Sequence, residues 1–168
     1  MTILHKPSIA LAIHNAGRKA NKVPHLNRGG CGVFAEALYT EMYKAGCRDM
    51  AIRLFTETSN RGVNVADVER SLLNDPTYNG NDANPFWDKG CSFSHVVIEW
   101  NGNFWDSTGK LASKERWGPF YAVQDGSLTF KTLSAINTVQ ANWNTMFNRK
   151  HIPELREAVA SAFKWVVP

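Results

Sequence analysis

Cys31 is the residue whose sequence context points most directly to chemistry. It lies in a glycine-rich turn, Gly29-Gly30-Cys31-Gly32, that runs directly into a predicted helix. The first N–H groups of a helix have no intrahelical partner, and with the helix dipole they favour a negative charge by about 0.3–1 kcal/mol. Since the thiolate is the nucleophilic form of cysteine, this position predicts a reactive thiol. The alternative is a buried structural cysteine at a tightly packed helix start.

A histidine and an aspartate are predicted to meet on the two strands of a hairpin. Two runs of strand-forming residues flank the Asn-Gly pair at 101–102, which is the strongest short-range hairpin signal. If this pair forms the centre of the turn, Val97 faces Asp106. Side chains alternate along a strand, so His95 shares the face of Val97 and becomes a diagonal neighbour of Asp106. We therefore predict a hydrogen bond between His95 and Asp106.

Cys31, His95 and Asp106 together have the composition of a catalytic triad. A carboxylate beside an imidazole fixes its tautomer and stabilises the imidazolium, while the other ring nitrogen faces the nucleophile. In this interpretation Cys31 is the nucleophile, His95 the base and Asp106 the orienting group. The alternative is that the two residues have no shared role, with His95 a half-buried strand histidine and Asp106 a surface or strand-end carboxylate.

The arrangement of these residues resembles the papain-like cysteine hydrolase superfamily, and most closely its transglutaminase-like branch. That branch has a glycine two positions before the nucleophile and an alanine four positions after it, matched here by Gly29 and Ala35 around Cys31. A glycine and a strand follow the helix. The catalytic histidine then opens a strand, and the next strand carries a tryptophan and the catalytic aspartate, matched by His95 and Asp106.

The resemblance covers residues 27–109 and implies an α+β, papain-like fold in which the nucleophile helix packs on an antiparallel β-sheet, with flanking N- and C-terminal helices. It also implies an oxyanion hole, which needs donors where negative charge develops. The Cys31 backbone N–H is the first candidate donor. His25 stands where papain relatives place a glutamine, and Asn27 competes with it for the same role.

The function expected from these residues is cysteine-dependent acyl transfer. The leading hypothesis is a thiol hydrolase, a peptidase or amidase that acts on a peptide or amide substrate through a Cys-His-Asp triad. A protein-glutamine deamidase or transglutaminase is the first alternative, and hydrolysis is favoured because no amine-binding element can be named. A non-catalytic binding module on a papain-like scaffold is the second, since fold does not determine function.

Length and charge limit the other possibilities. The chain has 168 residues, enough for a single catalytic domain over residues 1–168. Its 19 basic and 15 acidic residues give a net charge of +4, and a basic cluster at Arg18, Lys19, Lys22 and Arg28 precedes the nucleophile. This charge suits an acidic protein or peptide substrate. We do not expect a nucleic-acid partner, because no nucleic-acid-binding motif is present.

The cysteines indicate a reducing compartment. Three cysteines cannot all pair, and we expect Cys47 and Cys91 to be bystanders. No long apolar segment opens the chain or could span a membrane, so a cytoplasmic protein without membrane association is expected. No cofactor or metal is expected, although Cys91 could in principle join the three triad residues as a zinc ligand.

Further helices and strands are predicted around this core. The expected segments are a helix over 8–20, a helix from Val33 that ends at Gly46, a strand over 50–55, a helix over 66–73, a strand over 120–123, a helix over 133–147 and a last helix that begins at Pro153. A long loop over 74–90 contains Tyr78, Phe86 and Trp87. These aromatic side chains either line the approach to Cys31 or cover the core.

Overall fold

The computed structural model describes residues 6–27, 29–57, 64–74, 95–111, 121–123, 126–139 and 146–166. The helices are α1 (Lys6–Ala20), α2 (Cys31–Lys44), α3 (Val65–Leu73), α5 (Phe130–Val139) and α6 (Ile152–Phe163), with a short 3₁₀ helix η3 (Arg149–His151). The strands are β1 (Ala51–Glu57), β2 (His95–Trp100), β3 (Asn103–Asp106), β4 (Gly109–Leu111) and β5 (Tyr121–Val123). The predicted aromatic loop, apart from Asn74, and Cys91 lie outside the described residues.

The strands form one antiparallel sheet in the order β4-β3-β2-β1-β5. The predicted α+β class is therefore confirmed. The predicted hairpin is also confirmed. Ile98 pairs with Trp105, as expected for a turn with Asn101 and Gly102 at its centre. Asn101 and Gly102 both have positive φ, 52° and 71°, as a two-residue hairpin turn of the type favoured by Asn-Gly needs.

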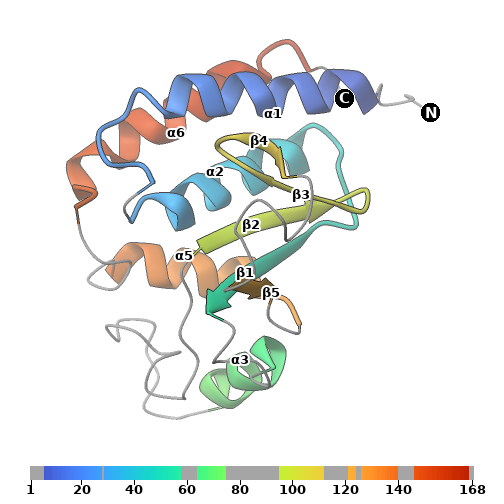
Figure 1. Ribbon diagram of the computed structural model, residues 1–168, viewed down its shortest axis with the longest axis vertical. Helices are drawn as coiled ribbons and strands as arrows, with labels where there is room; N and C mark the ends of the chain where they lie inside the picture. Colours follow the sequence, from blue (N-terminus) through green and yellow to red (C-terminus); the bar gives the residue numbers. More distant parts are fainter. Residues whose placement is uncertain are drawn as a thin grey trace.

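The core lies between one face of this sheet and the helices. Ile52 and Leu54 of β1, with Val96 and Ile98 of β2, point toward the helices and are fully or almost fully buried. The helix α2 packs on this face, and α1 and α6 lie side by side over the outer side of α2 (Figure 1). The helix α2 is thus covered on both sides, which holds its ends in fixed positions relative to the sheet.

Both ends of α2 are defined by glycines. At the start, a Cβ on Gly30 would lie 2.8 Å from the Leu26 carbonyl oxygen and 2.9 Å from a ring carbon of Phe147, so only glycine fits. At the other end Gly46 has φ 90°, and its N–H bonds the carbonyl of Tyr43 at 3.0 Å. The next N–H bonds the carbonyl of Met42 at 2.9 Å, which completes a Schellman cap. The predicted end of the helix at Gly46 is confirmed.

The helices predicted over 8–20, over 66–73 and from Pro153 are confirmed as α1, α3 and α6, and the strands predicted over 50–55 and 120–123 as β1 and β5. The helix predicted over 133–147 is wrong at its C-terminal end, because Met146 and Phe147 are not helical. Asn148 has an extended backbone with ψ 129°, and its side chain accepts the N–H of Lys150 at 3.0 Å to begin η3. That cap interrupts the helical path before α6.

No helix within the described residues has the length and apolar character needed to span a membrane.

Candidate active site

Cys31 is the first residue of α2 and is partly exposed. Gly30 before it provides no side-chain cap, and the first N–H that bonds back to the turn is that of Phe34, to the Gly30 carbonyl at 2.9 Å. The N–H groups of the first turn, including that of Cys31, are therefore the ones that a helix leaves without intrahelical partners. The sulfur and these donors lie at the same end of the helix, where negative charge is favoured.

His95 and Asp106 are joined by the hydrogen bond that the hairpin register predicts. His95 Nε2 lies 2.9 Å from Asp106 Oδ2, and the two residues are only 6% and 4% exposed. His95 is the first residue of β2 and Asp106 the last residue of β3, so the pair forms at one end of the hairpin. The ring of Phe55 packs edge-on against the imidazole, with ring centroids 6.2 Å apart, and helps to keep water from it.

Thr108 holds the second oxygen of Asp106. Asp106 Oδ1 accepts the Thr108 N–H at 2.7 Å and the Thr108 hydroxyl at 2.6 Å. The carboxylate therefore cannot rotate freely, and Oδ2 remains directed at His95. The sequence analysis missed this residue, although an aspartate followed two positions later by threonine at a turn is a recognisable pattern of side-chain to backbone bonding.

Cys31 meets the same imidazole from the other side. The helix α2 and the strand β2 begin at the same end of the molecule (Figure 1), and the Cys31 side chain is close enough to His95 to raise the pKa of its imidazole. Because Nε2 of the ring faces Asp106, Nδ1 is the nitrogen left for the sulfur. The structure thus brings together all three residues that the sequence analysis selected.

The electrostatics of the three groups favour a charged imidazole. Burial lowers the pKa of His95, but hydrogen bonds with Asp106 and Cys31 and the negative charges of both outweigh it and raise the pKa to about 9. Burial raises the pKa of Asp106, but the bond to His95 and the bonds from Thr108 outweigh it and lower that pKa. These interactions stabilise a charged imidazole beside a charged carboxylate.

The two predicted side-chain donors of an oxyanion hole are placed differently. His25 is exposed, with φ 58°, and none of its described contacts is with Cys31. Asn27 accepts a hydrogen bond from the Ser107 hydroxyl at 3.2 Å, which anchors it beside the turn that follows Asp106. Of the three predicted donors, the Cys31 N–H lies in the first turn of α2, and Asn27 is tied to the turn that follows Asp106.

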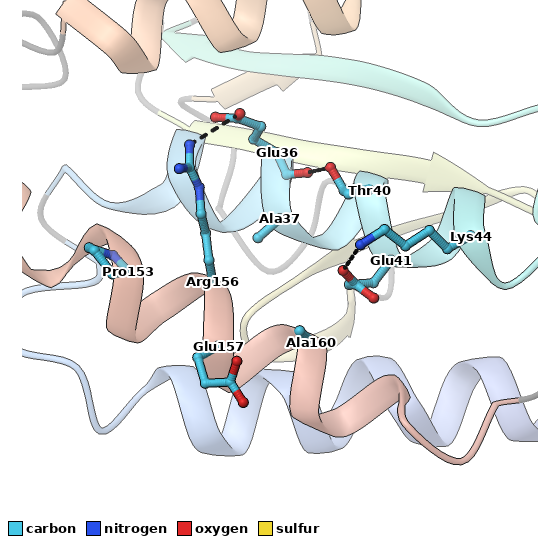
Figure 2. Close-up of a pocket in the computed structure, with 9 residues that line it drawn as sticks. All are labelled: Glu36, Ala37, Thr40, Glu41, Lys44, Pro153, Arg156, Glu157 and Ala160. Atoms are coloured by element: carbon cyan, nitrogen blue, oxygen red, sulfur yellow. Dashed lines mark hydrogen bonds and ion pairs between the residues drawn. The ribbon is translucent and has the colours of Figure 1, made fainter.

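Asn137 and Glu36 attach the first turn of α2 to the C-terminal helices. Asn137 Nδ2 donates to the Gly32 carbonyl at 3.0 Å and to Glu36 Oε2 at 2.6 Å. Glu36 Oε1 accepts from Ser134 at 3.2 Å and from Arg156 at 3.4 Å, the latter drawn in Figure 2. The carbonyl that follows Cys31 is therefore held by a buried side chain of α5. The sequence analysis missed this network; its only signal is a glutamate among the buried positions of α2.

A cavity between α2 and α6 is lined by none of the three residues Cys31, His95 and Asp106. It has a volume of about 480 Å³, and Figure 2 shows the side chains that surround it. Its basic groups are paired, Lys44 with Glu41 at 2.8 Å and Arg156 with Glu36 at 3.4 Å. The third acidic side chain of its lining, Glu157, lies 3.9 Å from Lys164, so each of the charged groups that line the cavity has an oppositely charged neighbour.

No protein-family model, curated protein or solved structure matches this chain. The function therefore has to be inferred from the site. In the part of the chain that the structure describes, no group of three or more His, Cys, Asp or Glu side chains is arranged to hold a metal ion.

Proposed function

We propose that the protein is a cysteine-dependent acyl-transfer enzyme, a thiol hydrolase that cleaves a peptide or amide substrate. The observation that carries this proposal is the buried imidazole of His95, which bonds Asp106 at 2.9 Å and whose pKa is raised by Asp106 and by Cys31. Covalent acyl transfer by a catalytic triad uses a nucleophile next to a base, and a carboxylate on the other side of the base that orients it.

In the first step the Cys31 thiolate attacks the substrate carbonyl carbon. A C–S bond forms, and the carbonyl π electrons move to the oxygen, which becomes an oxyanion near the free N–H groups of α2. When the carbonyl re-forms, the C–N bond breaks. The leaving nitrogen takes the proton from His95, and the products are a thioester on Cys31 and a free amine.

In the second step water releases the acyl group. Neutral His95 takes a proton from the water, whose oxygen bonds to the thioester carbon, and the C–S bond breaks with its electron pair on sulfur. The thiolate and the imidazolium are restored, and the sum of the two steps is amide plus water giving carboxylic acid plus amine. Asp106, held by Thr108, keeps the ring in position throughout.

The proposed fold is papain-like, of the transglutaminase-like branch. A helix that begins at the nucleophile packs on an antiparallel sheet, and neighbouring strands carry the histidine and the aspartate. A thioester on Cys31 can also be taken by an amine, which gives cross-linking, and hydrolysis of a glutamine side chain gives deamidation. These two reactions are the alternatives to peptide hydrolysis at the same site.

The test is incubation of casein with the purified protein, with and without a small primary amine, followed by mass spectrometry of the peptides. We expect new chain ends for hydrolysis, glutamate in place of glutamine for deamidation, or amine addition for transglutamination. Cys31→Ala should abolish the change, and Cys47→Ala is the matched control that should keep it. Full activity in Cys31→Ala would eliminate the proposal, and a casein left intact by both proteins would favour the binding-module alternative.

A further inference from the structure

A groove between α1 and α6 differs in character from the cavity of Figure 2. It encloses about 290 Å³, and α1 and α6 lie side by side along it (Figure 1). Its lining consists of Asn15, Arg18, Lys19, Lys22, Ser161, Ala162 and Trp165. No acidic side chain is among these residues. We call this the α1–α6 groove.

The positive charges of the α1–α6 groove are not compensated. Arg18, Lys19 and Lys22 are exposed, and within the described residues none of them forms an ion pair. The one hydrogen bond recorded for these three side chains joins Lys19 Nζ to the neutral Ser161 hydroxyl at 2.8 Å. Arg18 and Lys19 belong to the last turn of α1, and Lys22 lies in the turn that follows the helix. Three cations gathered at this end of the helix create a local positive potential that attracts an anionic group.

Trp165 is an independent indication of a ligand. Its side chain lines the groove and is 89% exposed, the largest exposure among the described large hydrophobic residues. Tryptophan and arginine are the residues most enriched where protein partners bind tightly. Buried Ala162 adds an apolar surface beside the indole ring. The groove therefore combines cations with an apolar wall.

We propose that the α1–α6 groove binds an acidic segment of a protein partner, in which carboxylates alternate with apolar side chains. A carboxylate fits the planar fork of Arg18, with Lys22 as a second cation, and an apolar side chain fits against Trp165. A peptide suits this surface better than a nucleic acid, because three cations gathered at one end of α1 do not track a run of phosphates. Arg28 lies outside the described residues.

The groove is attached to the candidate active site. Asn21, directly after α1, donates to the Ser107 carbonyl at 2.8 Å, and Ser107 follows Asp106. A segment bound along α1 is therefore held on the same rigid body as Cys31. Binding at the groove does not depend on the proposed reaction and can be measured without it.

The experiment is fluorescence anisotropy with a fluorescein-labelled peptide in which Glu alternates with Leu. A peptide with Lys in place of Glu and a single-stranded oligonucleotide serve as comparison probes. We expect only the acidic peptide to bind, with an affinity that falls as salt is added and by roughly tenfold or more in Arg18→Glu/Lys22→Glu. Trp165→Ala should weaken binding by roughly threefold to tenfold.

Two variants control for charge and for loss of an apolar side chain. Lys131→Glu changes an exposed lysine on α5, and Leu11→Ala removes an exposed leucine on α1, both outside the groove. Neither should change the affinity, and circular dichroism should show that all variants are folded. The proposal is overturned if the acidic peptide does not bind the unaltered protein, if Lys131→Glu weakens binding as much as the groove variant, or if the oligonucleotide binds more tightly through the same residues.

Discussion

The helix α2 has a cysteine at each end, and the two cysteines occupy opposite environments. Cys31 begins the helix, is partly exposed and bonds a charged imidazole. Cys47 follows the C-terminal cap and is buried, and burial raises the pKa of its thiol to about 11, although the nearby charge of Arg48 acts in the opposite direction. Burial thus keeps the Cys47 thiol protonated, whereas Cys31 is partly exposed at a helix start beside His95, so two residues of the same type have very different surroundings.

The largest expected difference is in alkylation rate. With a pKa of about 11, Cys47 has a thiolate fraction of only about 10⁻⁴ at pH 7, and its sulfur is also shielded. We expect iodoacetamide to label Cys31 at least about 100-fold faster than Cys47 at pH 7. Time-resolved labelling read by peptide mass spectrometry measures both rates in one sample. Equal rates at the two positions would remove the distinction between the ends of α2.

Removal of the His95 imidazole should lower the labelling rate of Cys31 and leave that of Cys47 unchanged. In His95→Ala the thiolate at Cys31 loses its counter-ion, so its labelling rate at pH 7 should fall by roughly 10- to 100-fold. The rate at Cys47 should not change, which makes this cysteine the internal control. A uniform change at both cysteines would instead indicate a loosened fold.

His95, beside the first end of α2, and Cys47, at the other end, should also affect the free energy of unfolding in different pH ranges. The pKa of His95 rises on folding from its ordinary 6.5 to about 9, so its stabilisation is complete below pH 6.5 and is lost as the pH rises toward 9. The change corresponds to at most about 3 kcal/mol in the free energy of unfolding. The pKa of Cys47 is raised from 9.0 to about 11, so its contribution is lost at higher pH, between these values.

Urea unfolding at a series of pH values measures these contributions. His95→Gln, which does not titrate, should abolish the decrease between pH 6.5 and 9 and leave the decrease above pH 9. Cys47→Ala should abolish the decrease above pH 9 and leave the decrease between pH 6.5 and 9. The pKa of Asp106 is lowered chiefly by His95, so Cys47→Ala should still lose stability as the pH falls below the ordinary value of 3.8, and His95→Gln should lose less there. A decrease below pH 9 that persists in His95→Gln would contradict the assignment to this imidazole.

The smallest expected effect comes from the residue that holds the first turn of α2. Asn137→Ala removes the donor to the Gly32 carbonyl and to Glu36, which should lower the free energy of unfolding by about 1–3 kcal/mol. We expect the labelling of Cys31 to slow by less than about threefold, because His95 remains in place. Ser134→Ala, which removes a longer bond to Glu36, is the milder control. A labelling loss as large as that of His95→Ala would mean that Asn137 governs the nucleophile directly.

The features that the sequence predicted well depend on local patterns. The turn residues Asn101 and Gly102 determine the register, and the register brings His95 to Asp106. The glycines before Cys31 mark the turn from which α2 begins, although the helix starts at Cys31, two residues before the predicted Val33. Each of these relations spans few residues, so the local rules of turns and strands were enough.

The features that were missed depend on contacts between distant segments. Asn137 reaches the Gly32 carbonyl from another helix, and no pattern around either residue indicates the pairing. The predicted helix over 133–147 shows the same limit, since apolar spacing continued through Met146 and Phe147 although Phe147 is used to pack against Gly30. Helical spacing alone does not show which neighbour a side chain will meet.

The close packing of Phe147 against Gly30 has a consequence for how the protein forms during synthesis. The turn before Cys31 leaves the ribosome long before residue 147 has been made. The helix α1 is made earlier still, and its neighbour α6 is made after residue 147. Contacts between such distant segments form late and slow the folding of a chain. A growing chain therefore carries Cys31 without the packing around Gly30 that positions it, and that packing is completed only after residue 147 has been made.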